Sequence, residues 1–372
     1  MIEIKEVKSR KQIREFIEFP LNLYKNNEYF VPPLYADEKA MFKSNYHYYS
    51  QSQAVFYNAY KDGEIVGRIQ GIIQFASNEK WNQKRVRFTR FDSINDQEVA
   101  NALFKAVEDW GKQKGMTEIV GPLGFSDLER EGLLVEGFEE LATFEEQYNY
   151  AYYQNLIENL GFVKEVDWLE RQLRAPKVIG DRLERVSNMM LKKYNLKIVK
   201  CKSVSDFIKR YGDAFFDLIE KTYDELYQTV PFTENIKKQL ISSFKLIVNP
   251  KYLLVIVDEN DKVVCFGFAM PSLSKAMQKS GGRLTLPTII KVLKAIKNPK
   301  IIDLALVGVL PEYAMKGISS ALFAFVQKAL IENELDYCET NLNLETNAKI
   351  INQWKNFDAR LHKRRRSYVK TL

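Results

Sequence analysis

Histidine and cysteine are scarce in this chain, and their scarcity narrows the chemistry that it can perform. Among 372 residues there are two histidines, His47 and His362, and three cysteines, none of which forms a CxxC pair. The spacing of the cysteines indicates reduced thiols rather than disulfides, and we predict no metal site. A histidine-built metal centre and a Ser-His-Asp triad are both disfavoured. Catalysis would have to depend on carboxylates, tyrosines, backbone dipoles and substrate positioning.

Long apolar segments are also missing. The longest, 253–257 and 263–271, are much shorter than the roughly 20 residues that cross a bilayer. The charged N-terminal segment lacks the apolar core of a secretory signal. With 46% hydrophobic and 13% aromatic residues, the chain can still form a globular fold. We expect a cytoplasmic protein, and the length indicates two or three domains.

Charge is distributed unevenly about the net value of +7. Residues 1–174 carry 22 Lys and Arg against 28 Asp and Glu, whereas residues 175–372 carry 33 against 20. The net charges are therefore −6 and +13, and a polyanion such as coenzyme A, an anionic membrane or an acidic carrier protein would be attracted to the second half. Nucleic acid is an unlikely partner, because the basic run 362–366 is short and terminal, as expected for a solvated last strand.

Hydrophobic periodicity predicts two modules of similar order, 1–174 and 175–372. In the first, the strands and helices are expected at 2–7, 9–25, 34–43, 54–75 (a hairpin turning at Asp62-Gly63), 86–91, 96–114, 117–122, 149–160 and 162–173. After a linker at 174–176 and a helical pattern at 180–193, those of the second are expected at 196–202, 205–228, 234–247, 252–257, 262–270, 301–309, 316–333, 337–342, 347–357 and 364–370. The fold class is therefore α/β (mixed α+β), with each module a mixed twisted sheet flanked by helices.

The segment 301–330 is the most informative one. An apolar strand pattern at 301–309 leads through Pro311 to a turn at Lys316-Gly317, and a helical pattern follows. Unpaired N–H groups and the positive end of the helix dipole make such a turn an anion site, for which a pyrophosphate is the natural ligand. The alternative is that the unit binds nothing, as many strand-turn-helix units do.

At this turn the chain resembles the GNAT-type acyl-CoA N-acyltransferases, whose fourth strand has a bulge and whose next helix opens with [RQ]-x-x-G-x-[GA]. Residues 314–319, AMKGIS, keep the central glycine and replace the leading Arg or Gln with Ala314. The whole chain looks like a group of two-module bacterial proteins of this superfamily, and part of it looks like bacterial ceramide synthases, which acylate the amine of a sphingoid base. The resemblance is carried by GRIQGIIQ (67–74), DWGKQKG (109–115), VGPLGFSDLEREGLLVEGF (120–138), YYQNLIENLGF (152–162), GVLPEY (308–313) and RSY (366–368).

The resemblance implies that acetyl-CoA or a longer acyl-CoA binds to the second module. Its binding residues would be Gly308, Val309, Met315, Lys316, Gly317, Ile318, Ser319, Ser320 and Asn347. Asn347 could equally be an ordinary cap of the helix that it opens. The first module is not expected to bind CoA, because its equivalent turn at 91–98 has no glycine and three carboxylates, and Asp96 or Ser93 is suited to capping the next helix.

N-acyl transfer needs an oxyanion donor and a base, and the second module offers candidates for both. The backbone at 308–310 could donate to the oxyanion if the superfamily geometry carries over. Glu339 is the first candidate for the base, and Asn341 shares its face of the predicted strand. The superfamily commonly places a tyrosine acid in the following helix, but that position is Trp354; Tyr368 could replace it only if the last strand returns to the site.

Two further segments bear on the acceptor. The long loop at 124–148 could bind an ammonium through Asp127, Glu131 or Glu136, or could be a surface loop with an apolar anchor. Segment 281–301 contains a basic amphipathic helix with Leu286, Ile289, Ile290, Leu293 and Ile296 as its apolar residues. This helix could make a peripheral contact with an anionic membrane through 286–300, cover an acyl chain, or pack on its own sheet.

These observations predict an acyl-CoA-dependent N-acyltransferase that acts on a primary amine, with a long-chain, sphingoid-type amine as the favoured acceptor and a peptide or polyamine as the next. The competing hypothesis is a non-catalytic protein that binds acyl-CoA or lipid through degenerate modules. Fold alone does not separate the two.

Overall fold

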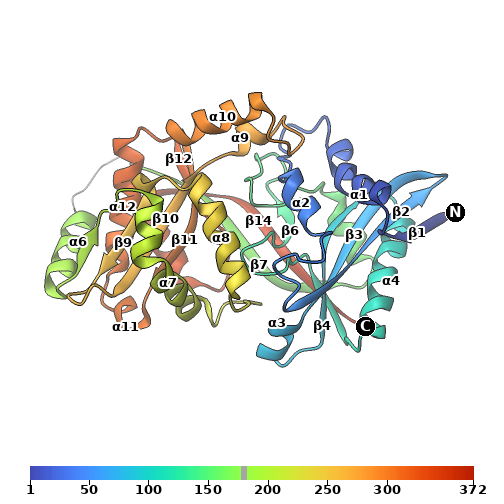
Figure 1. The fold of residues 1–372 in the computed structure, drawn as a ribbon, viewed down its shortest axis with the longest axis horizontal. Helices are drawn as coiled ribbons and strands as arrows, with labels where there is room; N and C mark the ends of the chain where they lie inside the picture. The colour runs from blue at the N-terminus through green and yellow to red at the C-terminus, as the bar shows by residue number, and fades with distance from the viewer. Residues whose placement is uncertain (177–181) are drawn as a thin grey trace. The chain divides into compact units, whose positions relative to one another are not determined.

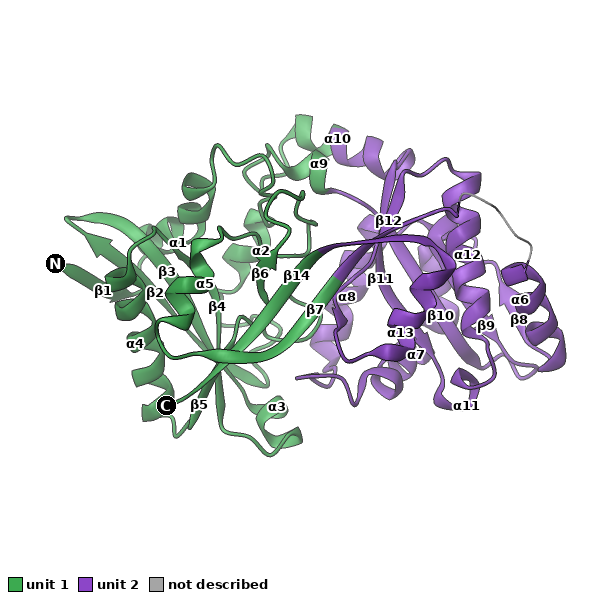
Figure 2. Cartoon of the chain, turned by 180° about the vertical axis from the view of Figure 1, so that it is seen from behind, with its two compact units in different colours: residues 1–169, 274–290, 363–372 green, residues 170–273, 291–362 purple. Residues whose placement is uncertain are grey.

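The computed structural model describes residues 1–176 and 182–372, and its mixed α and β elements confirm the predicted fold class (Figure 1). The chain forms two compact units (Figure 2). Unit 1 comprises residues 1–169, 274–290 and 363–372, and unit 2 comprises residues 170–273 and 291–362. Each unit draws most of its residues from one predicted module, while the division at residue 174 remains a prediction. Residues 180 and 181 of the predicted linker helix lie outside the described residues.

Unit 1 contains a sheet with the strand order β1-β2-β3-β4-β5-β14. The strands are β1 (Ile2–Glu6), β2 (Ser52–Lys61), β3 (Glu64–Gln74), β4 (Arg85–Ser93), β5 (Glu118–Gly121) and the part of β14 (Asp358–Thr371) that follows residue 362. A short strand, β6 (Leu133–Glu136), also pairs with β14. The helices of the unit are α1 (Arg10–Leu23), α2 (Tyr35–Ala40), α3 (Phe75–Lys80), α4 (Gln97–Gln113), α5 (Tyr152–Glu158) and α9 (Ser274–Met277).

The β2–β3 hairpin of unit 1 turns at Asp62 and Gly63, as predicted. Both residues have positive φ, 53° and 84°, which the two-residue hairpin requires. Helix α4 lies against this hairpin so closely that a Cβ on Gly67 would be 2.8 Å from a methyl group of Leu103. Asp96 caps α4 by accepting a bond of 2.9 Å from the N–H of Glu98, which confirms one of the two predicted caps.

Unit 2 contains a sheet with the strand order β7-β12-β11-β10-β9-β8. The strands are β7 (Val163–Arg174, of which 170–174 are in this unit), β8 (Lys197–Val199), β9 (Leu253–Val257), β10 (Val263–Pro271), β11 (Ile301–Val309) and β12 (Tyr337–Glu339), with β13 (Asn343–Leu344) paired to β7. Its helices are α6 (Arg182–Lys193), α7 (Val204–Tyr223), α8 (Glu234–Ile247), η1 (Pro250–Tyr252), α11 (Pro311–Ala314), α12 (Ser319–Glu332), α13 (Ala348–Gln353) and η2 (Trp354–Asn356). Helix α10 (Leu286–Lys297) has residues in both units.

In each unit, one strand has a bulge and pairs in parallel with the next strand along the chain. In β4 the register against β3 shifts at Arg90 and Phe91, and Arg90 has φ +47°. In β11 the register against β10 shifts so that Ala305 is the extra residue. Beside these bulges, β4 pairs in parallel with β5 and β11 with β12. Bulges of this kind re-aim strands next to active sites, and the repeated device supports the predicted similarity of the modules.

The basic run at 362–366 is not a solvated strand, so that prediction was wrong. Lys363 is 1% exposed and Arg365 is fully buried, and the side chain of His362 is also buried. The reason is that β14 lies between other strands instead of at an edge, and it pairs with both β5 and β6. Two of its arginines are paired within unit 1: Arg364 lies 3.1 Å and Arg366 lies 2.8 Å from Asp167.

Candidate functional site

The candidate site of unit 2 begins where β11 and β12 separate. The two strands pair in parallel from Ile301 and Tyr337 to Asp303 and Glu339, where β12 ends. Strand β11 continues to Val309 without this neighbour. The predicted strand at 337–342 is therefore shorter than expected and is interrupted before β13. An extended ligand could add to the edge of β11 that β12 leaves uncovered.

Two side chains occupy that edge of β11. Asn341 Nδ2 donates to the carbonyl of the bulge residue Ala305 over 2.9 Å. The hydroxyl of Tyr223, at the end of α7, donates to the carbonyl of Val307 over 3.0 Å and accepts from the N–H of Val307 over 3.3 Å. One hydroxyl thus satisfies both backbone groups of Val307, as a pairing strand would. Sequence reasoning missed Tyr223, because nothing in the pattern of α7 links its last residue to β11.

A chain of side-chain amides leads from this edge to Trp354. The indole Nε1 of Trp354 donates to Asn343 over 2.9 Å, and Asn343 in turn donates to Asn341 over 3.2 Å. Trp354 is 2% exposed and packs edge-on against Phe323. Trp354 thus anchors the amide chain that directs Asn341 toward the carbonyl of Ala305.

Glu339, the predicted base, lies beside a histidine. Its Oε1 is 2.6 Å from Nε2 of His362, and their side chains are 5% and 1% exposed. In register with Glu339 are Asp303 on β11 and Gln172 on β7, so the three side chains share one face of the sheet. The histidine was missed because the basic run around it indicated solvent exposure.

The predicted phosphate loop connects β11 to α12. Gly317 has φ +73°, and α12 starts at Ser319 without a side-chain cap. In the described part of the chain, the N–H groups of Gly317, Ile318 and Ser319 have no backbone acceptor, whereas those of Ser320 and the next residue donate to the carbonyls at 317 and 318. This is the arrangement that favours an anion at a helix N-terminus.

Other residues of the predicted CoA set have partners of their own. The hydroxyl of Ser320 donates to the carbonyl of Gly317 over 2.7 Å, and Asn347 caps α13 through the N–H of Ile350. The ammonium of Lys316 lies over the rings of Tyr313 and Tyr194, at 4.4 and 5.1 Å. Met315, by contrast, is 90% exposed.

Packing surrounds the loop on two sides. A Cβ on Gly308 would be 2.6 Å from Phe266 and 2.7 Å from Leu218, so Gly308 is where α7 approaches β11 closely. Helix α6 packs against α12, and Met190 comes within 3.8 Å of the Cβ position of Gly317. The N–H of Leu310 donates to the carbonyl of Val264. Bonded pairs alternate along an antiparallel ladder, so the N–H of Gly308 also faces β10, and of the predicted oxyanion donors at 308–310 Val309 is the one that turns its N–H to the uncovered edge.

The structure places the remaining candidates in unit 1. Tyr368 pairs with Gly121, is 1% exposed and donates to Glu158 over 3.0 Å. Burial, together with Glu158, raises the pKa of Tyr368 above its ordinary value. It therefore belongs to the sheet of unit 1, while Glu339 belongs to unit 2.

The predicted ammonium ligands of the long loop do not form one group. Glu136 is paired with Arg364 over 3.0 Å, whereas Glu131 is buried near Asp127. Burial, followed by the charges of Asp127 and Glu146, raises the pKa of Glu131 well above its ordinary value, and a neutral carboxyl is a weaker ligand for an ammonium. The loop itself is not an open surface loop, because Phe125 is fully buried among Tyr46, Tyr48 and Tyr49.

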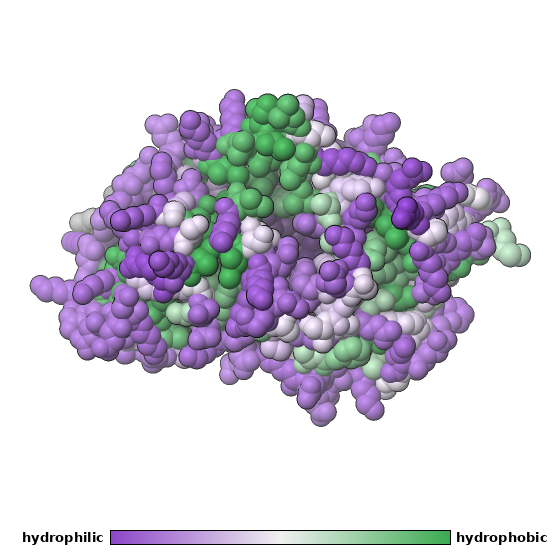
Figure 3. Space-filling view, in the orientation of Figure 1, coloured by the Kyte–Doolittle hydropathy of each residue, from purple (hydrophilic) through white to green (hydrophobic). Residues whose placement is uncertain are grey.

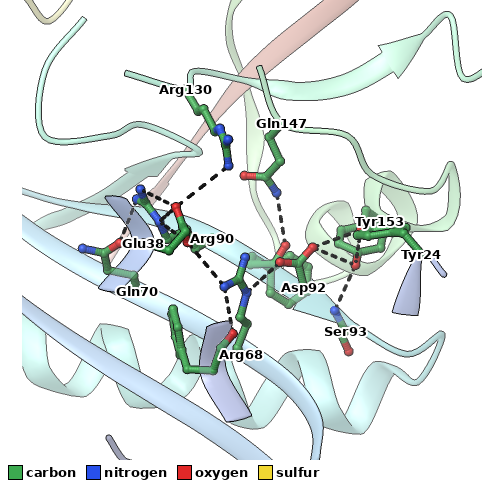
Figure 4. A network of polar contacts seen from close by, with 12 residues as sticks. Tyr24, Glu38, Arg68, Gln70, Arg90, Asp92, Ser93, Arg130, Gln147 and Tyr153 are labelled. Atoms are coloured by element: carbon green, nitrogen blue, oxygen red, sulfur yellow. Dashed lines mark hydrogen bonds and ion pairs between the residues drawn. The ribbon is translucent and has the colours of Figure 1, made fainter. Parts of the chain in front are cut away.

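Unit 1 also has a buried ionic network around its β4 bulge (Figure 4). Arg68 lies between Asp92, at 2.8 Å, and Glu38, at 3.6 Å, and Arg90 contacts Glu38 at 3.1 Å. Burial would raise the pKa of Glu38, but Arg90, Arg68 and Arg130 lower it to about 2. Asp92 also accepts from the hydroxyl of Tyr24 over 3.0 Å. Next to the β4 bulge, unit 1 therefore contains a buried cluster of oppositely charged side chains that compensate one another.

Comparison with solved structures identifies the fold. The structure aligns with a tandem GNAT protein from the clavulanic acid biosynthesis pathway with a TM-score of 0.58 and 10% sequence identity. The alignment covers 100% of this chain and 98% of that protein. A fungal GCN5-related glucosamine N-acetyltransferase region aligns with all of this chain and 38% of its own, with a TM-score of 0.59 and 11% identity. The chain thus has the tandem GNAT fold.

Two curated proteins narrow the resemblance. The chain is 25% identical over 380 residues to Protein YghO of Escherichia coli (strain K12), covering 98% of this chain and 94% of that protein. It is 23% identical over 291 residues to the bacterial ceramide synthase of Caulobacter vibrioides (strain NA1000 / CB15N), covering 75% and 72%. No protein-family model matches the sequence.

Proposed function

We propose that unit 2 is an acyl-CoA-dependent N-acyltransferase that transfers an acyl group to a primary amine. The observation that carries the proposal is the separation of β11 and β12 at a buried carboxylate, Glu339, with an uncapped helix N-terminus at Ser319 following the same strand. A thioester needs an extended edge to lie on, and its diphosphate needs an anion site. Strand β11 and the loop after it supply both within one unit.

In this proposal the pantetheine arm pairs with the edge of β11 that β12 leaves uncovered, in place of the side chains now bonded there. The thioester carbonyl takes the N–H of Val307, and the hydroxyl of Tyr223 gives up its present bonds to that residue. The diphosphate lies against the N–H groups at 317–319, with Lys316 beside it. The net charge of +13 on residues 175–372 attracts this polyanion.

The reaction then needs two proton movements. The amine nitrogen attacks the thioester carbon, a C–N bond forms, and one N–H proton passes to Glu339, whose carboxylate is oriented by His362. When the C–S bond breaks, the CoA thiolate takes a proton from the hydroxyl of Tyr223. Glu339 then releases its proton to water and Tyr223 regains one from water, which returns both groups to their starting states. The products are an amide and free CoA. Tyr223 is thus the proposed general acid, a role that the indole of Trp354 cannot perform.

The acceptor that we propose is a long-chain amine of the sphingoid type. This choice is supported by the 23% identity with a protein named as a bacterial ceramide synthase and by the apolar residues of α10. A peptide or a polyamine is the next candidate. The acyl donor is acetyl-CoA or a longer acyl-CoA.

A thiol-release assay tests this function. The full chain, incubated with palmitoyl-CoA or acetyl-CoA, is expected to release CoA only when sphinganine is present. Glu339→Gln is expected to abolish the release, whereas Glu332→Gln, whose side chain is 61% exposed on α12, should leave it unchanged. Absence of release with every amine offered would reject the enzyme.

The second candidate is a protein that binds acyl-CoA without turnover. It is favoured by Ala314 in place of the motif's Arg or Gln and by the tryptophan at 354, which is committed to Asn343. Calorimetric titration separates the two: a binder without release in the thiol assay supports this alternative, and a protein that binds neither acetyl- nor palmitoyl-CoA rejects both.

A further inference from the structure

Helix α10 exposes its apolar residues instead of burying them. Leu286 is 72% exposed, Ile290 and Leu293 are each 59% exposed, and Leu284 just before the helix is 53% exposed. Figure 3 shows apolar surface at the top of the view, where Figure 1 has α10. Of the alternatives that the sequence left open, packing of this face on the protein's own sheet was therefore wrong. The helix packs instead through Thr288, which is 6% exposed, and the half-buried residues at 292, 295 and 296; of the five predicted apolar residues, Ile296 is thus the one on the packed side.

The exposed residues form one stripe with a basic flank. At about 100° per residue, Ile289, Leu293, Leu286 and Ile290 fall within roughly 100° of the helix circumference. At that spacing Lys297 falls between Leu286 and Ile290 within the stripe, at the C-terminal end of the helix. Lys294 and Lys291 follow beyond Ile290 before the packed face begins, and all three lysines are exposed. The stripe and its flank lie on one continuous helix.

The surrounding sequence strengthens this charge pattern. Residues 262–302 contain seven lysines and Arg283 and no aspartate or glutamate. Arg283 is engaged with Glu18, at 2.8 Å, and with the ring of Tyr35. The three lysines of α10 have no ion-pair partner within the described residues, and their charge is directed to solvent.

We propose that α10 docks the protein on an anionic lipid surface, with the α10 stripe (Leu286, Ile289, Ile290 and Leu293) inserted between headgroups and the lysines on the headgroup phosphates. The docking does not depend on the proposed acyl transfer, although it would bring a membrane-resident amine close to the enzyme. A convex helix with an aliphatic face and a lysine flank is the form of an interfacial helix. No helix of the described residues meets the length and hydrophobicity of a membrane span, so the contact is peripheral.

Composition favours lipid over a protein partner. Energetically dominant residues of protein interfaces are enriched in Trp, Tyr and Arg and depleted in Leu, and lysine is depleted in such interfaces generally. The α10 stripe consists of leucine and isoleucine, and its flank consists of lysine alone. A bilayer accepts aliphatic side chains at any register, whereas a protein partner would need a shaped groove for this convex surface.

Vesicle sedimentation tests the proposal with the full chain. We expect binding to vesicles in which about a third of the phosphatidylcholine is replaced by phosphatidylglycerol, little binding to phosphatidylcholine alone, and weaker binding as salt increases. Ile290→Ser with Leu293→Ser should weaken binding about tenfold or more, and so should Lys291→Gln with Lys294→Gln. Matched controls are Val163→Ser with Ile331→Ser, and Lys328→Gln, which alter exposed residues elsewhere and should bind as the wild type does.

The outcomes that overturn the proposal are specific. Wild-type protein that ignores anionic vesicles rejects it, as does an α10 double variant that binds them normally. Light scattering at the same protein concentration tests a different occupant of the stripe, a second copy of the chain. That occupant would be indicated if the wild type is a dimer that does not bind vesicles and the Ile290→Ser and Leu293→Ser changes convert it to a monomer. Because none of these measurements uses CoA, loss of docking and loss of acyl transfer are distinguishable.

Discussion

The Nε2 atom of His362 lies 2.6 Å from Oε1 of Glu339, and this pair is buried where β12 ends. A carboxylate oriented by an imidazole at the end of a strand can hold an amine and take its proton. The two residues are 23 positions apart in the sequence, and only the return of β14 brings them together.

Removing either member of this pair should slow the acyl transfer to different extents. Glu339→Gln keeps the size of the side chain and removes the base, and kcat should fall about 100-fold or more. His362→Gln leaves the carboxylate but removes its neighbour, so a smaller loss and a changed pH profile of kcat are expected. Steady-state CoA release from pH 5 to 9 measures both. Equal kcat in Glu339→Gln and the wild type would remove this residue from the mechanism.

Tyr223→Phe separates the two tasks of the hydroxyl. If Tyr223 protonates the leaving thiolate, kcat falls by roughly 100-fold while the KM for acyl-CoA changes little, since Val307 still offers its N–H. The matched variant Tyr57→Phe alters a half-buried tyrosine in β2 of unit 1 and should have wild-type kinetics. A lower KM with an unchanged kcat in Tyr223→Phe would mean that the hydroxyl only bonds the backbone of Val307 when no coenzyme is bound and does not act as an acid.

Gly317→Ala tests the phosphate loop. At φ +73° an alanine is strained, and the N–H groups at 317–319 would be re-aimed, so the KM for acyl-CoA should rise about tenfold. Gly115→Ala is the control, because Gly115 has φ +79°, has nothing within 4 Å of its Cβ position and ends α4 in unit 1; at Gly317 a Cβ would meet Met190 only at an ordinary contact distance of 3.8 Å. If both variants raise KM equally, the effect is general strain and the loop has no special part in binding.

Glu38→Gln should destabilise unit 1 through its buried network. Removing the carboxylate leaves Arg90 and Arg68 with less compensation, and about 3 to 5 kcal/mol of unfolding free energy should be lost at pH 7. Because the pKa of Glu38 is lowered to about 2 in the folded protein, its stabilisation is present above its ordinary pKa and disappears as the pH falls toward 2. Urea unfolding at pH 7 and pH 3 should therefore show a smaller difference between variant and wild type at pH 3. An equal difference at both pH values would contradict the assignment.

Much of the fold could be predicted from hydrophobic periodicity and turn residues. The strand at 301–309 has the predicted bounds, and the Asp62-Gly63 turn and the Asp96 cap are confirmed. These features depend on residues close together in the sequence. The buried histidine at 362 and the role of Tyr223 depend on partners 23 and 84 residues away, so no local pattern could indicate them.

The α10 helix shows the same limit in another form. Its apolar stripe was visible in the sequence, but a stripe alone does not reveal what covers it. In the structure the helix packs through Thr288 and leaves Leu286 and Ile290 in solvent. The exposure of these side chains excludes packing of the stripe on the protein's own sheet, which the sequence pattern had left open.

A crystal structure of the full chain with palmitoyl-CoA tests the central claim most directly. We expect the diphosphate against the N–H groups at 317–319, the pantetheine arm along Val307, and Tyr223 displaced from its bonds to that residue. Coenzyme bound only in unit 1, or a Gly317 loop without ligand when neither unit binds the coenzyme, would contradict the proposed acyl transfer.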